Sequence, residues 1–204
     1  MDAFIQQLNN SMADLVDRTR RSLVQITNGQ GGSGAGTIWH PDGLIITNAH
    51  VIAGHGDLLV TLYDGNRYPA QVLAEDPTHD LAALSIVAAD LPTIEPGDSQ
   101  QLHAGQWVMA LGHPFGVLNA ATGGVVIGMG QQLGDIQFRN GADWLAVNLK
   151  LRPGHSGGPL VDAQGRLIGV NTIMNGPEVG VAIPVHVVKA FLKTHLGTPQ
   201  KQAV

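Results

Sequence analysis

The chain has 204 residues and a formal net charge of −5, and charged side chains make up only 13% of it. Nucleic-acid binding depends on clustered Lys and Arg side chains that face the phosphates, so this charge balance disfavours a nucleic-acid partner. The absence of cysteine excludes a disulfide framework, a thiol nucleophile and a zinc site with cysteine ligands.

Glycine, with 27 residues, and proline, with 11, favour many short strands joined by tight turns over a helical bundle. No segment approaches the roughly 20 apolar residues that cross a bilayer. The first thirty residues lack the basic start and unbroken apolar stretch of a signal peptide. We therefore expect a soluble chain without a membrane span, either cytoplasmic or extracytoplasmic after processing.

Residues 1–21 are expected to form an amphipathic helix. Six apolar side chains recur there at helical spacing on one face: Phe4, Ile5, Leu8, Met12, Leu15 and Val16. Such a stripe needs a cover, which is either the chain's own body or another copy of the chain.

Residues 22–90 carry short apolar runs separated by turn residues, which is typical of a small barrel. Six strand candidates fall in this range, at residues 22–27, 36–39, 43–47, 58–63, 68–73 and 81–87. The turn Asp64-Gly65-Asn66 between the fourth and fifth runs is a strong hairpin signal.

Residues 91–104 are polar and contain proline, and we interpret them as a linker. A second group of strand candidates in residues 105–184 predicts a second barrel. Residues 185–197 should form a closing helix, which begins after Pro184 and is capped by Gly197. The predicted fold is therefore all-β, with two six-stranded barrels between an N-terminal and a C-terminal helix.

The segment Gly154-His155-Ser156-Gly157-Gly158 is the strongest chemical signal in the chain. A serine framed by glycines suits a turn that presents the hydroxyl and also offers backbone N–H groups to a developing negative charge. A serine hydroxyl is nearly inert by itself, so the chemistry also needs a base and a carboxylate that orients it.

Upstream residues supply candidates for both of these roles. His50 follows the apolar run 44–46, and Asp80 precedes the apolar run 81–87. Asp76, four residues earlier, is an alternative carboxylate. The order His, Asp, Ser is that of the chymotrypsin-type proteases. The nine histidines show no paired spacing with a nearby acidic ligand, so we expect no metal site.

Taken together and in order, these motifs resemble the trypsin-like protease domain of the HtrA/Deg family. The resemblance covers nearly the whole chain and rests on the runs at residues 34–52, 76–82, 110–116, 153–160 and 181–184. It implies that His50 is the general base, Asp80 its orienting carboxylate and Ser156 the nucleophile. It also implies an oxyanion hole formed by the N–H groups of Gly154 and Ser156, and no metal or organic cofactor.

The implied function is an ATP-independent serine endopeptidase of protein quality control that cleaves unfolded or exposed polypeptide segments. The alternative is a non-catalytic polypeptide-binding or chaperone module of the same fold, with the oxyanion loop in an unproductive shape. HtrA relatives trimerise through their N-terminal segments, so the helix at residues 1–21 is the candidate contact for a homotrimer. The PDZ domains common in the family are not expected, because only eight residues follow Leu196.

Two departures from the family pattern bear on the site. The family usually has Asn immediately before the serine, where this chain has His155, which we interpret as a loop side chain and not as a second base. Residues 148–152 also differ, and this segment lines the primary specificity pocket in chymotrypsin-like proteases. The candidate pocket residues are Lys150, Ile173 and Val181. Ile173 and Val181 predict small or medium aliphatic residues before the cut, whereas Lys150 would favour acidic ones.

Overall fold

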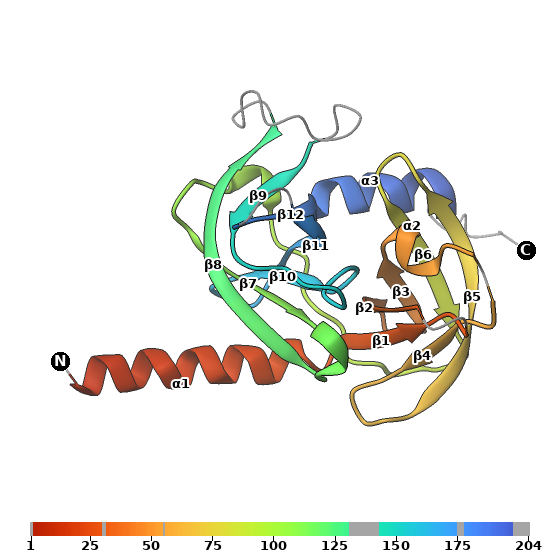
Figure 1. Cartoon of the computed structure of the whole chain (residues 1–204), viewed down its shortest axis with the longest axis horizontal. Coiled ribbons are helices and arrows are strands. Elements are labelled where there is room, and N and C mark those ends of the chain that lie inside the picture. Colours follow the sequence, from red (N-terminus) through yellow and green to blue (C-terminus); the bar gives the residue numbers. More distant parts are fainter. Residues whose placement is uncertain (1, 30–31, 55, 131–142, 175–177, 198–204) are drawn as a thin grey trace, which may run out of the picture.

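The structure is a computed structural model that describes residues 2–29, 32–54, 56–130, 143–174 and 178–197, without the side chains of Ile173 and Met174. Two closed antiparallel barrels of six strands each form the body, and a helix lies at either end of the chain (Figure 1). This architecture confirms the predicted fold class.

The first barrel contains strands in the neighbour order β1-β2-β3-β6-β5-β4, and β4 pairs back to β1. Its interior is filled by aliphatic side chains such as Ile26, Ile45 and Leu84, which are fully buried. Gly36 faces these side chains, because a Cβ atom there would lie 2.9 Å from Ile26 and Ile45. The strands are β1 (Leu23–Thr27), β2 (Ser33–His40), β3 (Leu44–Thr47), β4 (Leu59–Thr61), β5 (Arg67–Asp76) and β6 (Leu81–Ile86).

The second barrel repeats this order as β10-β11-β12-β9-β8-β7. Its interior is built from residues such as Val108, Leu145, Leu160 and Ile168, all of them buried. The strands are β7 (Trp107–Gly112), β8 (Ala120–Met129), β9 (Leu145–Asn148), β10 (Pro159–Asp162), β11 (Leu167–Met174) and β12 (Val179–Pro184).

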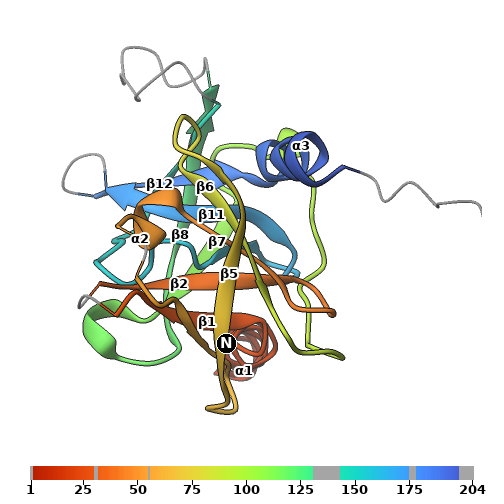
Figure 2. The same ribbon diagram turned by 90° about the vertical axis from the view of Figure 1, so that its right-hand side faces the viewer.

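The two terminal helices differ in how they meet the barrels. α3 (Val185–Leu196) packs Val188 and Phe191 into a buried cluster, whereas α1 (Asp2–Thr19) buries only Leu15 and Thr19. The first turns of α1 project beyond the body, as Figure 1 shows from the side and Figure 2 shows end-on. None of the helices in the described ranges is long and apolar enough to cross a membrane.

The expected linker, residues 91–104, is hydrogen-bonded to the second barrel and to α3. Gly97 N–H donates to the carbonyl of Leu167, and Leu167 N–H donates to the carbonyl of Glu95, both at 2.8 Å. The short 3₁₀ helix η1 (Ser99–Gln101) follows, and the Ser99 hydroxyl lies 2.8 Å from Nδ1 of His186 on α3. The connection therefore ties the second barrel to the closing helix.

The barrels meet at a close backbone contact that includes the segment after Ser156. Ala35 N–H donates to the Ser156 carbonyl at 2.8 Å, and the Thr47 hydroxyl donates to the Ala35 carbonyl at 2.7 Å. Gly157 has a φ of +84°, and a Cβ atom there would lie 2.0 Å from the Ala35 carbonyl oxygen. Only glycine combines this conformation with this approach, so the junction explains the glycine after the serine.

Candidate active site

His50 and Asp80 lie side by side at the edge of the first barrel. His50 stands on α2 (Ala49–Ile52), a single turn that follows β3, and Asp80 precedes β6. The Asp80 carboxylate oxygens lie 2.8 and 3.0 Å from Nδ1 of His50. This contact fixes the imidazole with Nδ1 toward the carboxylate, which leaves Nε2 as the proton acceptor.

Other donors hold the Asp80 carboxylate in place. The Thr172 hydroxyl, from β11 of the second barrel, donates to Oδ2 at 2.6 Å, and the His50 backbone N–H donates to Oδ1 at 3.1 Å. Asp80 itself adopts a left-handed φ of +54°, and the Asn48 side chain donates to its carbonyl at 3.0 Å. The carboxylate is therefore fixed by groups from both barrels.

These contacts keep Asp80 ionised. Burial by itself would raise the pKa of Asp80, but the hydrogen bonds from His50 and Thr172 and the charge of His50 together lower that pKa below its ordinary value of 3.8. An ionised carboxylate can both orient an imidazole and stabilise the imidazolium that forms when it accepts a proton.

Asp76 is occupied elsewhere. Its carboxylate accepts the backbone N–H of Thr78 at 2.9 Å and lies 2.6 Å from Nδ1 of His79. Asp76 thus stabilises the turn that leads to Asp80. Of the two candidate carboxylates, the structure places Asp80 at His50.

Ser156 presents its hydroxyl on the second barrel. The side chain is half-buried, and Oγ donates to the Thr172 carbonyl at 2.7 Å. Within the described part of the chain, Oγ makes no hydrogen bond to His50. Thr172 therefore contacts Asp80 through its hydroxyl and Ser156 through its carbonyl.

The segment before Ser156 forms a tight turn with the features of type II. His155 N–H donates to the Arg152 carbonyl at 2.9 Å, and Pro153 and Gly154 occupy the two central positions, with Gly154 at a φ of +102°. A Cβ atom at Gly154 would lie 2.3 Å from the His113 carbonyl oxygen, so the position requires glycine.

Neighbouring backbone groups fix the direction of the central peptide in this turn. Phe115 N–H donates to the Pro153 carbonyl at 3.1 Å, and His113 N–H donates to the Gly154 carbonyl at 2.8 Å. The peptide between Pro153 and Gly154 is trans, so its N–H points away from Phe115. Across the described residues, neither this N–H nor that of Ser156 donates a hydrogen bond, and both are available to an oxyanion.

Comparisons with known proteins give the family of the chain. Residues 34–170 match the family model described as trypsin-like peptidase domain. The chain belongs to this family. The similarity extends to the "Probable periplasmic serine endoprotease DegP-like" of Chlamydia pneumoniae, at 40% identity over 74% of the chain and 32% of the relative. It also extends to "Serine protease HTRA2, mitochondrial" of Drosophila pseudoobscura pseudoobscura, at 38% identity over 79% of the chain and 38% of the relative.

Solved structures of HtrA-type proteases are also similar to this chain and confirm the HtrA/Deg resemblance. The HtrA-type protease AlgW with tripeptide superposes with a TM-score of 0.81 at 34% identity, over 89% of this chain and 62% of that one. The same protease with decapeptide gives a TM-score of 0.81 at 28% identity, over 90% and 67% of the two chains. The peptidase domain described here spans about a third of the length of the curated relatives it matches.

The structure corrects one of the expected pocket residues and leaves another outside its description. The side chain of Val181 is fully buried among Ile46, Leu81 and Phe191, so it cannot line a pocket. The neighbouring Gly180 faces the second barrel instead, because a Cβ atom there would meet Leu149 and Leu151. The side chain of Ile173 lies outside the described residues.

Lys150 is exposed and forms an ion pair of 3.4 Å with Glu178, which precedes β12. Its side chain is 59% exposed and that of Glu178 is 66% exposed, so solvent screens the pair strongly. Within the described ranges, no group of three His, Asp or Glu side chains could hold a metal ion.

The sequence did not reveal the contacts of two residues beside the candidate site. Thr172 bridges Asp80 and Ser156, and His155, expected as an ordinary loop side chain, is only 3% exposed. A signal for Thr172 existed, since polar Asn171 and Thr172 end the apolar run that begins at Leu167. A buried polar side chain needs a hydrogen-bond partner, so these two residues predict a polar contact where the apolar run ends.

We predict that Thr172→Val raises the pKa of Asp80, because valine keeps the shape but removes the donor to Oδ2. A carboxyl whose pKa is lower in the folded than in the unfolded protein stabilises the fold at pH values above its unfolded-state pKa. This stabilisation is lost as the pH falls through the folded-state pKa. The variant should therefore be less stable than the wild type at neutral pH and lose less on acidification. NMR titration of the Asp80 carboxyl and urea unfolding measure both effects. Thr61→Val on β4 is the control, and an unchanged Asp80 titration would contradict the prediction.

Proposed function

We propose that this chain is the catalytic domain of an ATP-independent serine endopeptidase of protein quality control, which cleaves unfolded or exposed polypeptide segments. In this proposal Ser156 is the nucleophile, His50 the general base and Asp80 the carboxylate that orients it. The N–H groups of Gly154 and Ser156 form the oxyanion hole, and no metal or organic cofactor takes part. The peptide complexes of the related AlgW protease support a polypeptide substrate.

The observation that carries the proposal is the arrangement of three groups around Thr172. The Asp80 carboxylate, held by the Thr172 hydroxyl, fixes His50, and the Ser156 hydroxyl lies on the Thr172 carbonyl. Thr172 is thus in contact both with the carboxylate that holds the proposed base and with the proposed nucleophile. Two N–H groups without an internal acceptor complete a site for acyl transfer.

The reaction starts when the Ser156 hydroxyl leaves the Thr172 carbonyl and turns toward His50. Oγ attacks the scissile carbonyl carbon while Nε2 of His50 takes its proton, and the oxyanion that forms accepts hydrogen bonds from the N–H groups of Gly154 and Ser156. His50 then gives this proton to the leaving amine as the C–N bond breaks, which leaves an acyl-enzyme. A water molecule then attacks the ester carbonyl carbon while His50 takes its proton. The bond between this carbon and Oγ breaks as His50 returns the proton to Oγ, which releases the carboxylic acid and restores the Ser156 hydroxyl.

The resting position of Ser156 favours a second candidate function. Its hydroxyl donates to the Thr172 carbonyl at 2.7 Å instead of to His50, which suits a chain that binds polypeptide without cleaving it. The two functions differ in one respect that can be measured, because only a peptidase has a Ser156 that reacts with an acylating or phosphonylating probe.

The proposal includes small or medium aliphatic residues before the cut. Residues 148–152 and β12 carry no carboxylate that would attract Lys or Arg. Lys150 is the competing influence and would favour acidic residues. Its pairing with the exposed Glu178 already neutralises part of that attraction.

We predict that a fluorophosphonate labels the wild-type chain at Ser156 and that Ser156→Ala is not labelled. The variant should also lose hydrolysis of a denatured protein mixture, down to the rate that oxyanion stabilisation alone sustains, roughly 10³–10⁴ above that in water. Mapping the cut sites of the wild type reads the residue preference in the same experiment. A folded wild type that is neither labelled nor active would favour the binding module. Cuts mainly after Lys or Arg would contradict both expected preferences.

We predict that Asp80→Asn lowers kcat on the order of 10⁴-fold, because an amide favours the wrong tautomer of His50. Asp76→Asn is the matched comparison, since Asp76 bonds to His79 and the turn but not to His50. It should keep most of the activity. Steady-state kinetics of both variants on one peptide substrate provide the measurement, and equal losses would show that Asp76 also serves the base.

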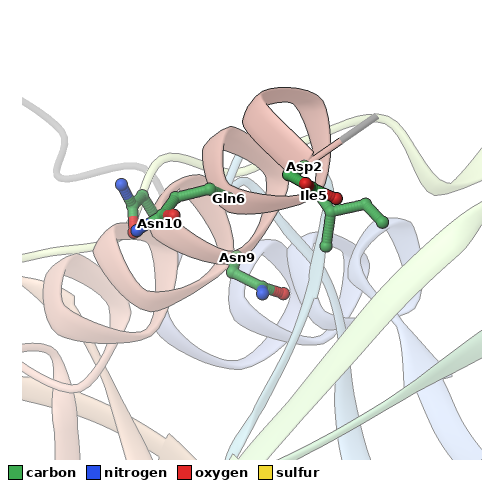
Figure 3. A pocket seen from close by; sticks show the side chains of 5 residues that line it. All are labelled: Asp2, Ile5, Gln6, Asn9 and Asn10. Atoms are coloured by element: carbon green, nitrogen blue, oxygen red, sulfur yellow. The ribbon is translucent and has the colours of Figure 1, made fainter.

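We also propose that α1 joins the peptidase domain into a homotrimer. Phe4, Ile5 and Leu8 are 70%, 49% and 45% exposed, whereas Leu15 is buried against the body. The helix is thus anchored at its C-terminal end and uncovered at its start. Figure 3 shows the hollow beside these first turns, lined by Asp2, Ile5, Gln6, Asn9 and Asn10, where amide groups can hydrogen-bond to a neighbouring helix.

We predict that replacing Phe4, Ile5 and Leu8 together with Gln converts a trimer into a monomer, because the apolar surface that a second copy would cover is removed. The three positions are exposed, so the fold of the monomer should not change. Light scattering at micromolar concentration measures the mass, and circular dichroism checks the fold. A wild-type chain that is already monomeric under these conditions would rule the trimer out.

A further inference from the structure

Two imidazoles that take no part in the proposed proton transfer are buried beside the oxyanion turn. His155 lies in the turn itself and is 3% exposed, and His113 lies between β7 and the 3₁₀ helix η2 (Pro114–Gly116) and is 4% exposed. Histidine is seldom buried this completely without a structural use. The two segments are in direct contact, since a Cβ atom at Gly112 would lie 2.6 Å from Cα of His155.

Each imidazole accepts a backbone N–H through Nδ1. Arg152 N–H lies 3.1 Å from Nδ1 of His155, and Asn119 N–H lies 3.2 Å from Nδ1 of His113. Neither N–H has another acceptor within the described residues. The Arg152 carbonyl, 3.2 Å from Nδ1 of His155, already accepts the His155 N–H. With Nδ1 unprotonated, both backbone N–H groups keep their acceptors, and each ring carries its proton on Nε2, which is buried without a hydrogen-bond partner among the described residues.

The two acceptors close two linked turns. The bond from Arg152 N–H to Nδ1 of His155 is a second link, besides the backbone bond from His155 N–H to the Arg152 carbonyl, between the two ends of the turn that contains Gly154. The bond from Asn119 to His113 closes the loop whose His113 and Phe115 N–H groups hold the carbonyls of Gly154 and Pro153. This loop contains two non-glycine residues with a positive φ, Phe115 at +53° and Asn119 at +58°. Such conformations cost of order 1–3 kcal/mol each and persist only where surrounding contacts hold them.

We propose that His113 and His155 are positioning residues for the oxyanion hole: as neutral hydrogen-bond acceptors, they hold the two turns that aim the Gly154 and Ser156 N–H groups at the substrate. This inference rests on the proposed peptidase function. It assigns to His155 the task of fixing the direction of the peptide between Pro153 and Gly154.

The surroundings of both rings keep them neutral. Burial lowers the pKa of His155, a hydrogen bond with the Arg152 backbone opposes this in part, and the charge of Arg152 lowers the pKa further. Burial likewise lowers the pKa of His113, the Val24 backbone opposes this, and a charge on His155 would lower the pKa further. Across the described residues no carboxylate contributes to either pKa. Protonation would turn each Nδ1 from an acceptor into a donor, so the turns depend on the neutral form.

Substitution tests the acceptor separately from the packing. His155→Leu fills a similar volume without an acceptor and should lower kcat on the order of 10²-fold, the cost of one lost oxyanion donor, while KM stays near the wild-type value. His155→Asn supplies a carbonyl acceptor, as in most of the HtrA family, and should recover most of kcat. His186→Leu is the control, because His186 contacts Ser99 on η1 and should leave kcat unchanged.

Imidazole NMR on the folded wild type gives an independent readout. Long-range proton–nitrogen spectra distinguish the two neutral tautomers, and we expect Nδ1 without a proton in both His113 and His155 at neutral pH. A proton on Nδ1 of either ring would overturn the proposal, and so would a folded His155→Leu with wild-type kcat. If His155→Leu does not fold, the spectra and the kinetics of His155→Asn decide. A wild type that neither hydrolyses peptides nor reacts with the fluorophosphonate would instead refute the peptidase function, and the spectra would still test the acceptors.

Discussion

The proposed site depends on the contact between two closed barrels, because each barrel carries only some of its residues. His50 and Asp80 belong to the first barrel, whereas Ser156 and the turn before it belong to the second. The 2.6 Å bond from the Thr172 hydroxyl to Asp80 crosses this junction. A bond this short to an ionised group is charge-assisted and roughly twice as strong as a neutral one, so it fixes the distance between the two halves.

The two barrels can approach this closely because the backbone around Ser156 and Gly157 meets the backbone of Ala35 without side chains between them. Gly157 and Ala35 bring the two barrels together, and the buried Asn171 side chain donates to the carbonyls of Leu111 and Pro159. The backbone carbonyls of Ser156 and Ala35 accept hydrogen bonds inside the protein, whereas Oδ1 of Asn171 is buried without a partner among the described residues. In the proposed peptidase, such a junction would keep the N–H groups of Gly154 and Ser156 oriented before the substrate arrives, which is how hydrogen-bond donors contribute most to catalysis.

Sequence patterns predicted the barrels well because glycine and turn residues separate short apolar runs along the whole chain. They also brought out His50 and Asp80, which the structure places in contact. They misplaced Val181, because β12 is buried on both faces and shows no alternation from which the pocket face could be inferred. The four-residue α2 is too short for a helical period, and the roles of Thr172 and His155 arise only from contacts between distant segments.

A second group of the same three residue types shows why contacts, and not residue types, define the site. Ser99 Oγ lies 2.8 Å from Nδ1 of His186, and Nε2 of His186 lies 3.7 Å from the Asp143 carboxylate. Ser99 is fully buried, and its Oγ also accepts the His186 backbone N–H at 3.2 Å, so no substrate carbonyl could reach it. The proposed nucleophile Ser156 differs in being accessible and in lying beside two N–H groups that are free to bind an oxyanion.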